Sequence, residues 1–70
     1  MTLETVVNRL IATLFCSIRA RGVHNDELAF AAARELTDVM LRRTHLNARV
    51  DNSTFSDLVT LGKELWTQIQ

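Results

Sequence analysis

The chain lacks proline altogether, and it has only two glycines and one cysteine among its 70 residues. A protein built from short antiparallel strands needs many tight turns, and such turns draw heavily on proline and glycine. The composition therefore argues against an all-β meander. Because the chain has a single cysteine, it also has no disulfide framework of its own.

The sequence also lacks an excess of charge of either sign and a long hydrophobic run. Eight Lys and Arg residues balance eight Asp and Glu residues, so the formal net charge is zero. The uncharged stretch from Leu10 to Ile18 is far shorter than the ~20 residues that span a bilayer. Glu4 before this stretch and Arg19 and Arg21 after it do not fit a signal peptide. We therefore expect a cytoplasmic protein without membrane contact, and the lone cysteine fits that reducing compartment.

What the sequence does have is helical periodicity over most of its length. With 47% hydrophobic residues, a chain of this size is expected to form one small domain over residues 1–70. Apolar side chains recur at helical spacing over Thr2 to Arg21, over Asn25 to Arg43, and from Ser53 or Thr54 to the C-terminus. The stretch from Thr44 to Asn52 loses the period and is predicted to be a loop. The pattern predicts an all-α fold, a small three-helix bundle.

The main apolar faces of these segments predict the core of the bundle. They consist of Leu3, Val6, Val7, Leu10, Ile11, Leu14, Phe15 and Ile18 on the first helix, Leu28, Ala29, Ala32, Ala33, Leu36, Val39 and Met40 on the second, and Phe55, Leu58, Val59, Leu61, Leu65, Trp66 and Ile69 on the third. Thr2, Asn25 and Thr54 are expected to cap the three helices, because such side chains accept hydrogen bonds from exposed backbone N–H groups. Thr54 and Asp57 also have the spacing of a capping box.

The two glycines have different predicted roles. Gly22 follows the first helix and is expected to take the left-handed conformation that ends helices. Gly62 lies inside the apolar face of the third helix, where a glycine costs about 1 kcal/mol relative to alanine. Two interpretations of Gly62 remain open. It allows close approach of another helix, or it breaks the segment and makes the bundle four-helical.

The first two predicted helices each have a second apolar stripe. The stripes consist of Ala12, Cys16 and Ala20 on the first helix and of Phe30, Thr37 and Leu41 on the second. A three-helix bundle needs one apolar stripe per helix, so the additional stripes predict an interface. The small residues on the first helix would let another helix approach closely.

The small size of the chain also favours self-association. Ordering costs ~1.5 kcal/mol per residue, which a core this small barely recovers without disulfides, a metal or a second subunit. We therefore predict a homodimer, with a protein partner as the other use of the same surface. The alternative is that the second stripes cover the loop of the same chain.

The residues that carry chemistry do not form a recognisable site. Cys16 lies in the middle of the first predicted helix and His24 lies beyond its end, so their side chains need not meet as a nucleophile and its base. Neither a third catalytic group nor a glycine-rich oxyanion loop accompanies them. His24, His45, Cys16 and Asp51 lack the close pairs typical of metal ligands. We expect Cys16 to be structural. The sequence predicts no enzymatic activity, no metal and no cofactor.

Arginine accounts for seven of the eight basic residues, and it is the residue favoured for phosphate recognition. Arg42, Arg43 and Arg49 belong to the one dense basic cluster. The zero net charge and the acids at the start of the second helix argue against an autonomous DNA-binding domain. The simpler interpretation is that these arginines complement the negative ends of the helices.

Two functions follow as expectations. The preferred one is a small non-enzymatic interaction protein, such as a regulator, adaptor or inhibitor, that docks a helical surface onto its partner and forms a homodimer. The alternative is a dimeric DNA-associated transcriptional regulator that uses Arg42, Arg43 and Arg49.

Overall fold

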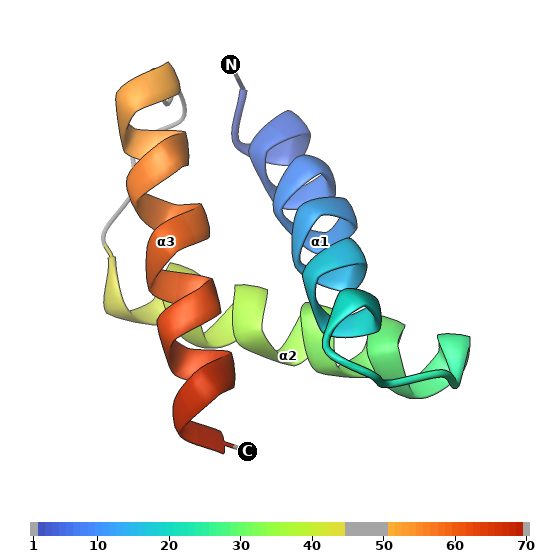
Figure 1. The fold of residues 1–70 in the computed structure, drawn as a ribbon. Helices are drawn as coiled ribbons and strands as arrows, with labels where there is room; N and C mark the ends of the chain where they lie inside the picture. The colour runs from blue at the N-terminus through green and yellow to red at the C-terminus, as the bar shows by residue number, and fades with distance from the viewer. Residues whose placement is uncertain (1, 45–50, 70) are drawn as a thin grey trace.

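Three helices make up most of the protein in a computed structural model that describes residues 2–44 and 51–69 (Figure 1). They are α1, Leu3–Ala20; α2, Asp26–Arg43; and α3, Asn52–Ile69. Every pair of helices is in contact, and no strand occurs in the described part of the chain. The predicted all-α fold of three helices is confirmed.

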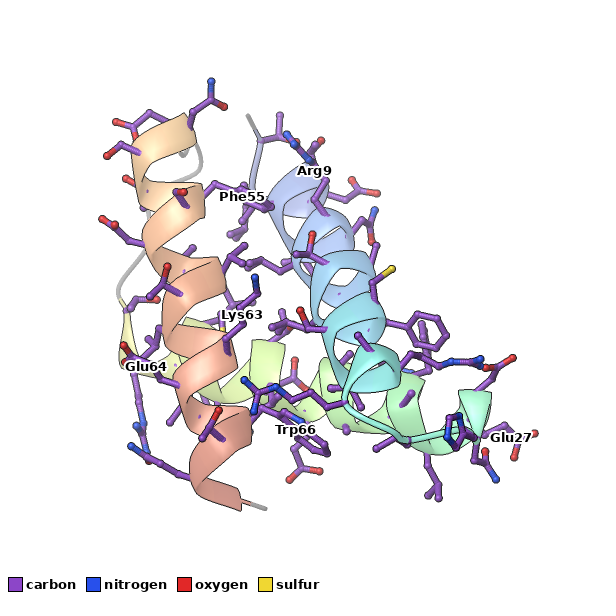
Figure 2. All side chains as sticks on the ribbon, viewed as in Figure 1. Arg9, Glu27, Phe55, Lys63, Glu64 and Trp66 are labelled. Atoms are coloured by element: carbon purple, nitrogen blue, oxygen red, sulfur yellow. The ribbon has the colours of Figure 1, made fainter. Side chains whose placement is uncertain are left out.

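The helices α1 and α3 lie side by side and run in the same direction, and α2 crosses behind both of them in the view of Figure 1. Near the start of both helices, the guanidinium carbon of Arg9 lies 4.7 Å from the ring centroid of Phe55 (Figure 2). Further along both helices, Leu14 faces Gly62. Because α2 crosses the pair, one of its flanks borders α1 and the other borders α3.

Local hydrogen bonds start α1 and α2 at the predicted residues. The Thr2 Oγ1 atom accepts a bond from the Thr5 N–H at 3.3 Å, and the Asn25 Oδ1 atom accepts one from the Leu28 N–H at 3.2 Å. Each bond satisfies one of the N–H groups that a first helical turn leaves without a partner. Both predicted caps are confirmed.

The start of α3 differs from the prediction. Asp51 Oδ1 accepts a hydrogen bond from the Thr54 N–H at 2.7 Å, and the Asp51 carbonyl accepts one from the Phe55 N–H at 3.0 Å. Asp51 is therefore the capping residue, and the predicted cap at Thr54 is wrong, because Thr54 lies within the first turn. The bond from the Thr54 N–H holds the pKa of the Asp51 carboxyl group below its usual value.

The end of α1 depends on the backbone conformation of Gly22. Its φ is +104°, a region that strains any residue with a side chain, and its N–H donates to the Arg19 carbonyl at 3.1 Å. The predicted positive φ at Gly22 is confirmed. A Cβ atom at this position would have no heavy atom within 4 Å, so the position requires glycine for its conformation and not for space.

The core lies where the three helices meet. Its buried apolar residues are Val6, Leu10, Leu14 and Ile18 of α1, Ala29, Ala33, Leu36 and Met40 of α2, and Leu58 of α3. A Cβ atom at Gly62 would lie 2.7 Å from Leu14 Cδ2 and 2.9 Å from Met40 Sδ. Gly62 thus lets α3 approach both other helices, and α3 continues through it. The close-approach interpretation is confirmed, and the break into a fourth helix is wrong.

Candidate docking surface

An open apolar groove lies between α1 and α2. Its walls are Asn8, Ile11, Ala12 and Phe15 of α1 and Phe30 of α2, and its volume is about 330 Å³. We call it the Phe30 groove. The Phe30 residue is 47% exposed, although full burial of such a side chain contributes about 1.5–3 kcal/mol. An exposed aromatic beside further apolar walls is typical of a docking surface.

The N-terminal half of α2 places Phe30 at this groove. Ala29 and Ala33 are fully buried, and Phe30 follows on the flank of α2 that borders α1. One turn later, the guanidinium carbon of Arg34 lies 5.8 Å from the ring centroid of Phe30. Such a cation–π contact covers part of the ring and restricts its orientation.

A second arginine, Arg19, packs against Phe15 on the α1 side of the groove. The guanidinium carbon of Arg19 lies 6.0 Å from the ring centroid of Phe15. The same guanidinium forms an ion pair with Asp26, the first residue of α2. This pair joins the end of α1 to the start of α2, and it neutralises the positive charge of Arg19 beside Phe15.

The predicted small-residue stripe on α1 is exposed along its length. Ala12, Cys16 and Ala20 all face solvent. Ala12 lines the Phe30 groove and Cys16 lies one turn further on, but Ala20 borders a different hollow beside Trp66. Residues four apart advance about 40° around a helix, so the stripe drifts away from α2. Of these three residues, only Ala12 lines the groove.

The predicted stripe on α2 is divided between surface and core. Phe30 is exposed and Leu41 is half-buried on the same flank, whereas Thr37 is fully buried. The Thr37 Oγ1 atom donates to the Ala33 carbonyl at 2.9 Å, which satisfies the hydroxyl group inside the bundle. Thr37 therefore belongs to the core, and we leave it out of the candidate surface.

Leu28 is an exposed apolar residue that the sequence pattern assigns to the core. It is 63% exposed, more than Phe30. The first turn of α2 extends past α1 (Figure 1), and Leu28 lies about 120° around the helix from buried Met40. In the sequence, this angular distance from the centre of the apolar face is the one signal that Leu28 is exposed. It shows that the apolar residues of α2 span a wider arc of the helix than its buried residues do.

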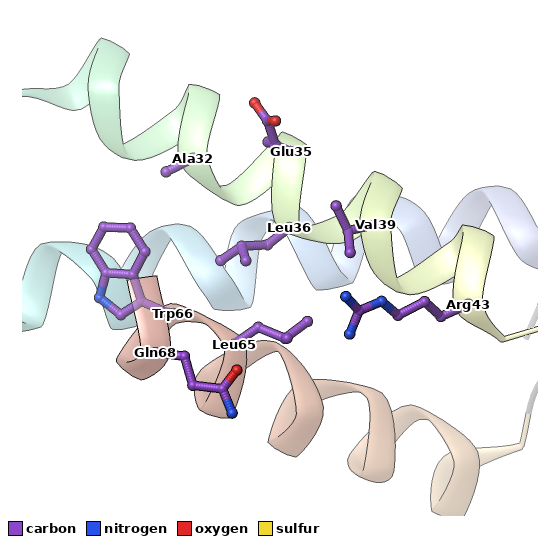
Figure 3. Close-up of a pocket in the computed structure, with 8 residues that line it drawn as sticks. All are labelled: Ala32, Glu35, Leu36, Val39, Arg43, Leu65, Trp66 and Gln68. Atoms are coloured by element: carbon purple, nitrogen blue, oxygen red, sulfur yellow. The ribbon is translucent and has the colours of Figure 1, made fainter. Parts of the chain in front are cut away.

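A larger pocket lies between α2 and α3, with a volume of about 520 Å³ (Figure 3). We call it the α2–α3 pocket, and it is lined by Ala32, Glu35, Leu36, Val39, Arg43, Leu65, Trp66 and Gln68. Trp66, which the apolar pattern assigns to the core, is half-buried and forms one end of the pocket. Its Nε1 atom is buried and has no hydrogen-bond partner within residues 2–44 and 51–69. No sequence motif points to this pocket, because it depends on how α2 and α3 cross.

The arginines proposed for nucleic-acid contact do not form one surface. Arg42 lies in a shallow hollow with Glu35 and Asp38, and its Nε atom donates to the Asp38 carbonyl at 3.3 Å. Arg43 points instead toward α3, into the α2–α3 pocket (Figure 3). Arg49 lies outside the described residues. Arg42 and Arg43 thus lie on different flanks of α2, and carboxylates adjoin Arg42.

Other chemical groups are dispersed. Cys16 is exposed on α1, His24 is exposed in the turn after it, and His45 lies outside the described residues. Residues 2–44 and 51–69 contain no group of three or more His, Cys, Asp or Glu side chains that could hold a metal ion. Within the same residues, no helix combines the length and the hydropathy needed to cross a bilayer.

Comparison with known protein families, with curated proteins and with solved structures gives no significant match to this chain.

Proposed function

We propose that this protein is a small non-enzymatic interaction module of the cytoplasm, which forms a homodimer through the Phe30 groove. As a regulator, adaptor or inhibitor it would act by docking its helices onto a partner. The observation that supports this proposal best is the 47% exposure of Phe30 beside the apolar walls of the groove.

A second copy of the chain is the occupant that fits this groove best. The groove combines an exposed ring, Phe30 on its α2 wall, with a small residue, Ala12, on its α1 wall. In a two-fold dimer the same patch serves both subunits, so each Phe30 can pack over the Ala12 of the other copy. The net charge of zero means that two copies do not repel each other.

The proposed interface extends beyond the five residues of the groove. A stable interface buries about 800 Å² on each partner. The exposed surface of the whole chain is 4734 Å², so a dimer would cover roughly a sixth of it. We therefore extend the proposed interface to Cys16, one turn after Ala12 on α1, and to Leu41, about three turns after Phe30 on the same flank of α2.

Sedimentation of the wild-type chain and of Phe30→Glu tests the proposal. At micromolar concentration we expect the wild type to sediment at twice its mass of 7.9 kDa. The Phe30→Glu variant should sediment as a monomer, because a buried unpaired charge strongly destabilises an interface. Its far-UV circular dichroism should remain helical, since Phe30 is half exposed in the monomer.

Leu28→Glu is the matched control. Leu28 lies two residues before Phe30 and is even more exposed, but it does not line the groove. This variant should remain dimeric. A wild-type chain that stays at 7.9 kDa at high concentration would overturn the homodimer, and equal effects of both variants would overturn the assignment of the interface to the groove.

The DNA-associated regulator is supported less well, because Arg42 and Arg43 lie on different flanks of α2 and carboxylates adjoin Arg42. The variant Arg42→Ala, Arg43→Ala, Arg49→Ala separates the two functions. If these arginines bind phosphates, duplex binding falls and the log–log salt slope becomes shallower by about one unit per lost contact. Under our proposal, the triple variant keeps its dimer and its partner binding.

A further inference from the structure

The α2–α3 pocket has the dimensions of a small-molecule site. Its volume of about 520 Å³ falls within the ~300–1,000 Å³ typical of ligand pockets. Its walls are mainly apolar, with Leu36 and Val39 on one side, Leu65 on the other, and the Trp66 indole at one end (Figure 3). Such walls would enclose an aliphatic or aromatic group.

The opposite end of the pocket presents a positive charge. Figure 3 shows the Arg43 guanidinium reaching back from the last turn of α2 between Val39 and Leu65. Within residues 2–44 and 51–69, Arg43 has no ion pair and no side-chain hydrogen bond. The carboxylate of Glu35 also lines the pocket, but it points away from Arg43 (Figure 3).

From this juxtaposition we infer that the α2–α3 pocket binds a small amphipathic carboxylate, an apolar chain or ring that ends in one carboxylate group. The planar guanidinium of Arg43 donates two parallel N–H bonds to a carboxylate, a geometry that fixes the orientation of the ligand. The apolar part of the ligand then lies against Leu36, Val39 and Leu65 and ends at Trp66.

The length of the pocket sets the class of ligand. Ala32 lies at the Trp66 end of the pocket and Val39 at the Arg43 end (Figure 3). A helical rise of 1.5 Å per residue places these two residues roughly 10 Å apart. A medium-chain fatty acid in an extended conformation matches this span. Octanoate is therefore a suitable probe.

This site is separate from the proposed dimer interface. The Phe30 groove lies on the flank of α2 that borders α1, and the α2–α3 pocket lies on the flank that borders α3. The Phe30→Glu variant should therefore bind octanoate as the wild type does, whatever its oligomeric state. The two proposals can fail independently.

Trp66 provides a direct readout of binding. It is the one tryptophan of the chain, and the chain has no tyrosine, so intrinsic fluorescence reports on the pocket. Titration with octanoate, below its micelle concentration and at neutral pH, should give a saturable change in Trp66 emission. Octanol, which has a similar chain but no charge, should bind about tenfold more weakly, the loss expected for one charge-assisted hydrogen-bonded pair.

Two arginine variants separate a specific contact from general attraction to positive charge. Arg43→Gln should weaken octanoate binding about tenfold and leave octanol binding unchanged. Arg42→Gln removes the same charge from the neighbouring residue, which faces away from the pocket, and should change neither affinity. Both side chains are exposed, so the fold should persist in both variants.

A third variant tests the apolar part of the site. Ala32→Leu places a larger side chain beside Trp66 and should weaken octanoate and octanol alike. The inference is overturned if octanoate and octanol bind equally, or if Arg42→Gln and Arg43→Gln have the same effect. It is also overturned if neither Trp66 emission nor calorimetric titration detects saturable octanoate binding.

Discussion

The turn between α1 and α2 and the middle of α3 each depend on a glycine, but for different reasons. At Gly22 the backbone φ is +104°, and the space beyond the Cα atom is open. At Gly62 the backbone is ordinary helix, and the space is occupied by Leu14 and Met40. The first glycine is required by the conformation of its own residue, and the second by side chains from two other helices.

This difference predicts how each position responds to the size of a new side chain. At Gly22 almost any side chain meets the same backbone strain, so the cost should depend little on size. At Gly62 each additional atom must displace core side chains, so the cost should rise with size. Substitutions at the two glycines test this comparison, and substitutions at Asp51 and Asn25 test the starts of α3 and α2.

The largest expected effect is that of Gly62→Val. A Cβ atom alone would lie 2.7 Å from Leu14 Cδ2 and 2.9 Å from Met40 Sδ, and valine adds two methyl groups to it. We expect the free energy of unfolding to fall by about 3 kcal/mol, at the upper end of the usual cost of overpacking a core. Urea unfolding followed by circular dichroism measures this change.

Gly62→Ala is the control for size. Leu14 Cδ2 and Met40 Sδ belong to side chains that can rotate, and alanine favours a helix over glycine by about 1 kcal/mol. The alanine variant should therefore be much less destabilised than the valine variant. If the two variants unfold at the same urea concentration, the close approach at Gly62 does not limit the packing of α3.

A smaller effect is expected for Gly22→Val. No heavy atom lies within 4 Å of the added Cβ atom, so the cost is that of a left-handed backbone, about 1–2 kcal/mol. Gly22→Ala should cost nearly as much, and Gly22→Asn less, because asparagine tolerates positive φ. A melting temperature for Gly22→Val equal to that of the wild type would mean that α1 ends without a positive φ.

The smallest effect is expected at the start of α3, for Asp51→Asn. Asparagine caps helices as well as aspartate does, so stability at neutral pH should hardly change. The pKa of Asp51 is lowered in the folded protein, so its carboxylate stabilises the fold above the unfolded pKa, and this stabilisation is lost as the pH falls below about 4. As the pH falls, the wild type should therefore lose stability relative to the Asp51→Asn variant.

Melting temperatures of both chains, measured from neutral pH to below about pH 4, check this expectation. The same series on Asn25→Asp tests the start of α2, where the cap is a neutral amide. That variant should acquire the acid-sensitive contribution that Asp51→Asn loses. Parallel pH curves for wild type and Asp51→Asn would contradict the lowered pKa of Asp51.

Much of the fold follows from signals that act over four residues or fewer. The apolar period places the three helices, Thr2 and Asn25 start two of them, and Gly22 ends the first. The wrong prediction of Thr54 as the cap of α3 also arises from such short-range signals. Asp51 and Thr54 are both good caps three residues apart, and local pattern alone does not choose between them.

The candidate surfaces follow from the sequence only in part. The second stripes led to Phe30 and Ala12, which do line one groove. They also included Thr37, which is buried, and they left out Leu28, which is exposed. An apolar or small residue at the edge of a stripe is buried only if another helix covers that edge. The sequence of a single helix does not show which other helix packs against it.

The amino-acid sequence by itself determined where the helices of this protein lie, because caps, glycine conformation and apolar period act through the backbone of one helix at a time. Only the tertiary structure decided that α2 crosses one side of a parallel pair of helices, α1 and α3. That crossing turns one flank of α2 into the Phe30 groove and the other into the α2–α3 pocket, and it requires a glycine at position 62. The physical reason is that the burial of a side chain depends on contacts with residues far apart in the chain. Close packing allows the three helices only a few arrangements that make such contacts.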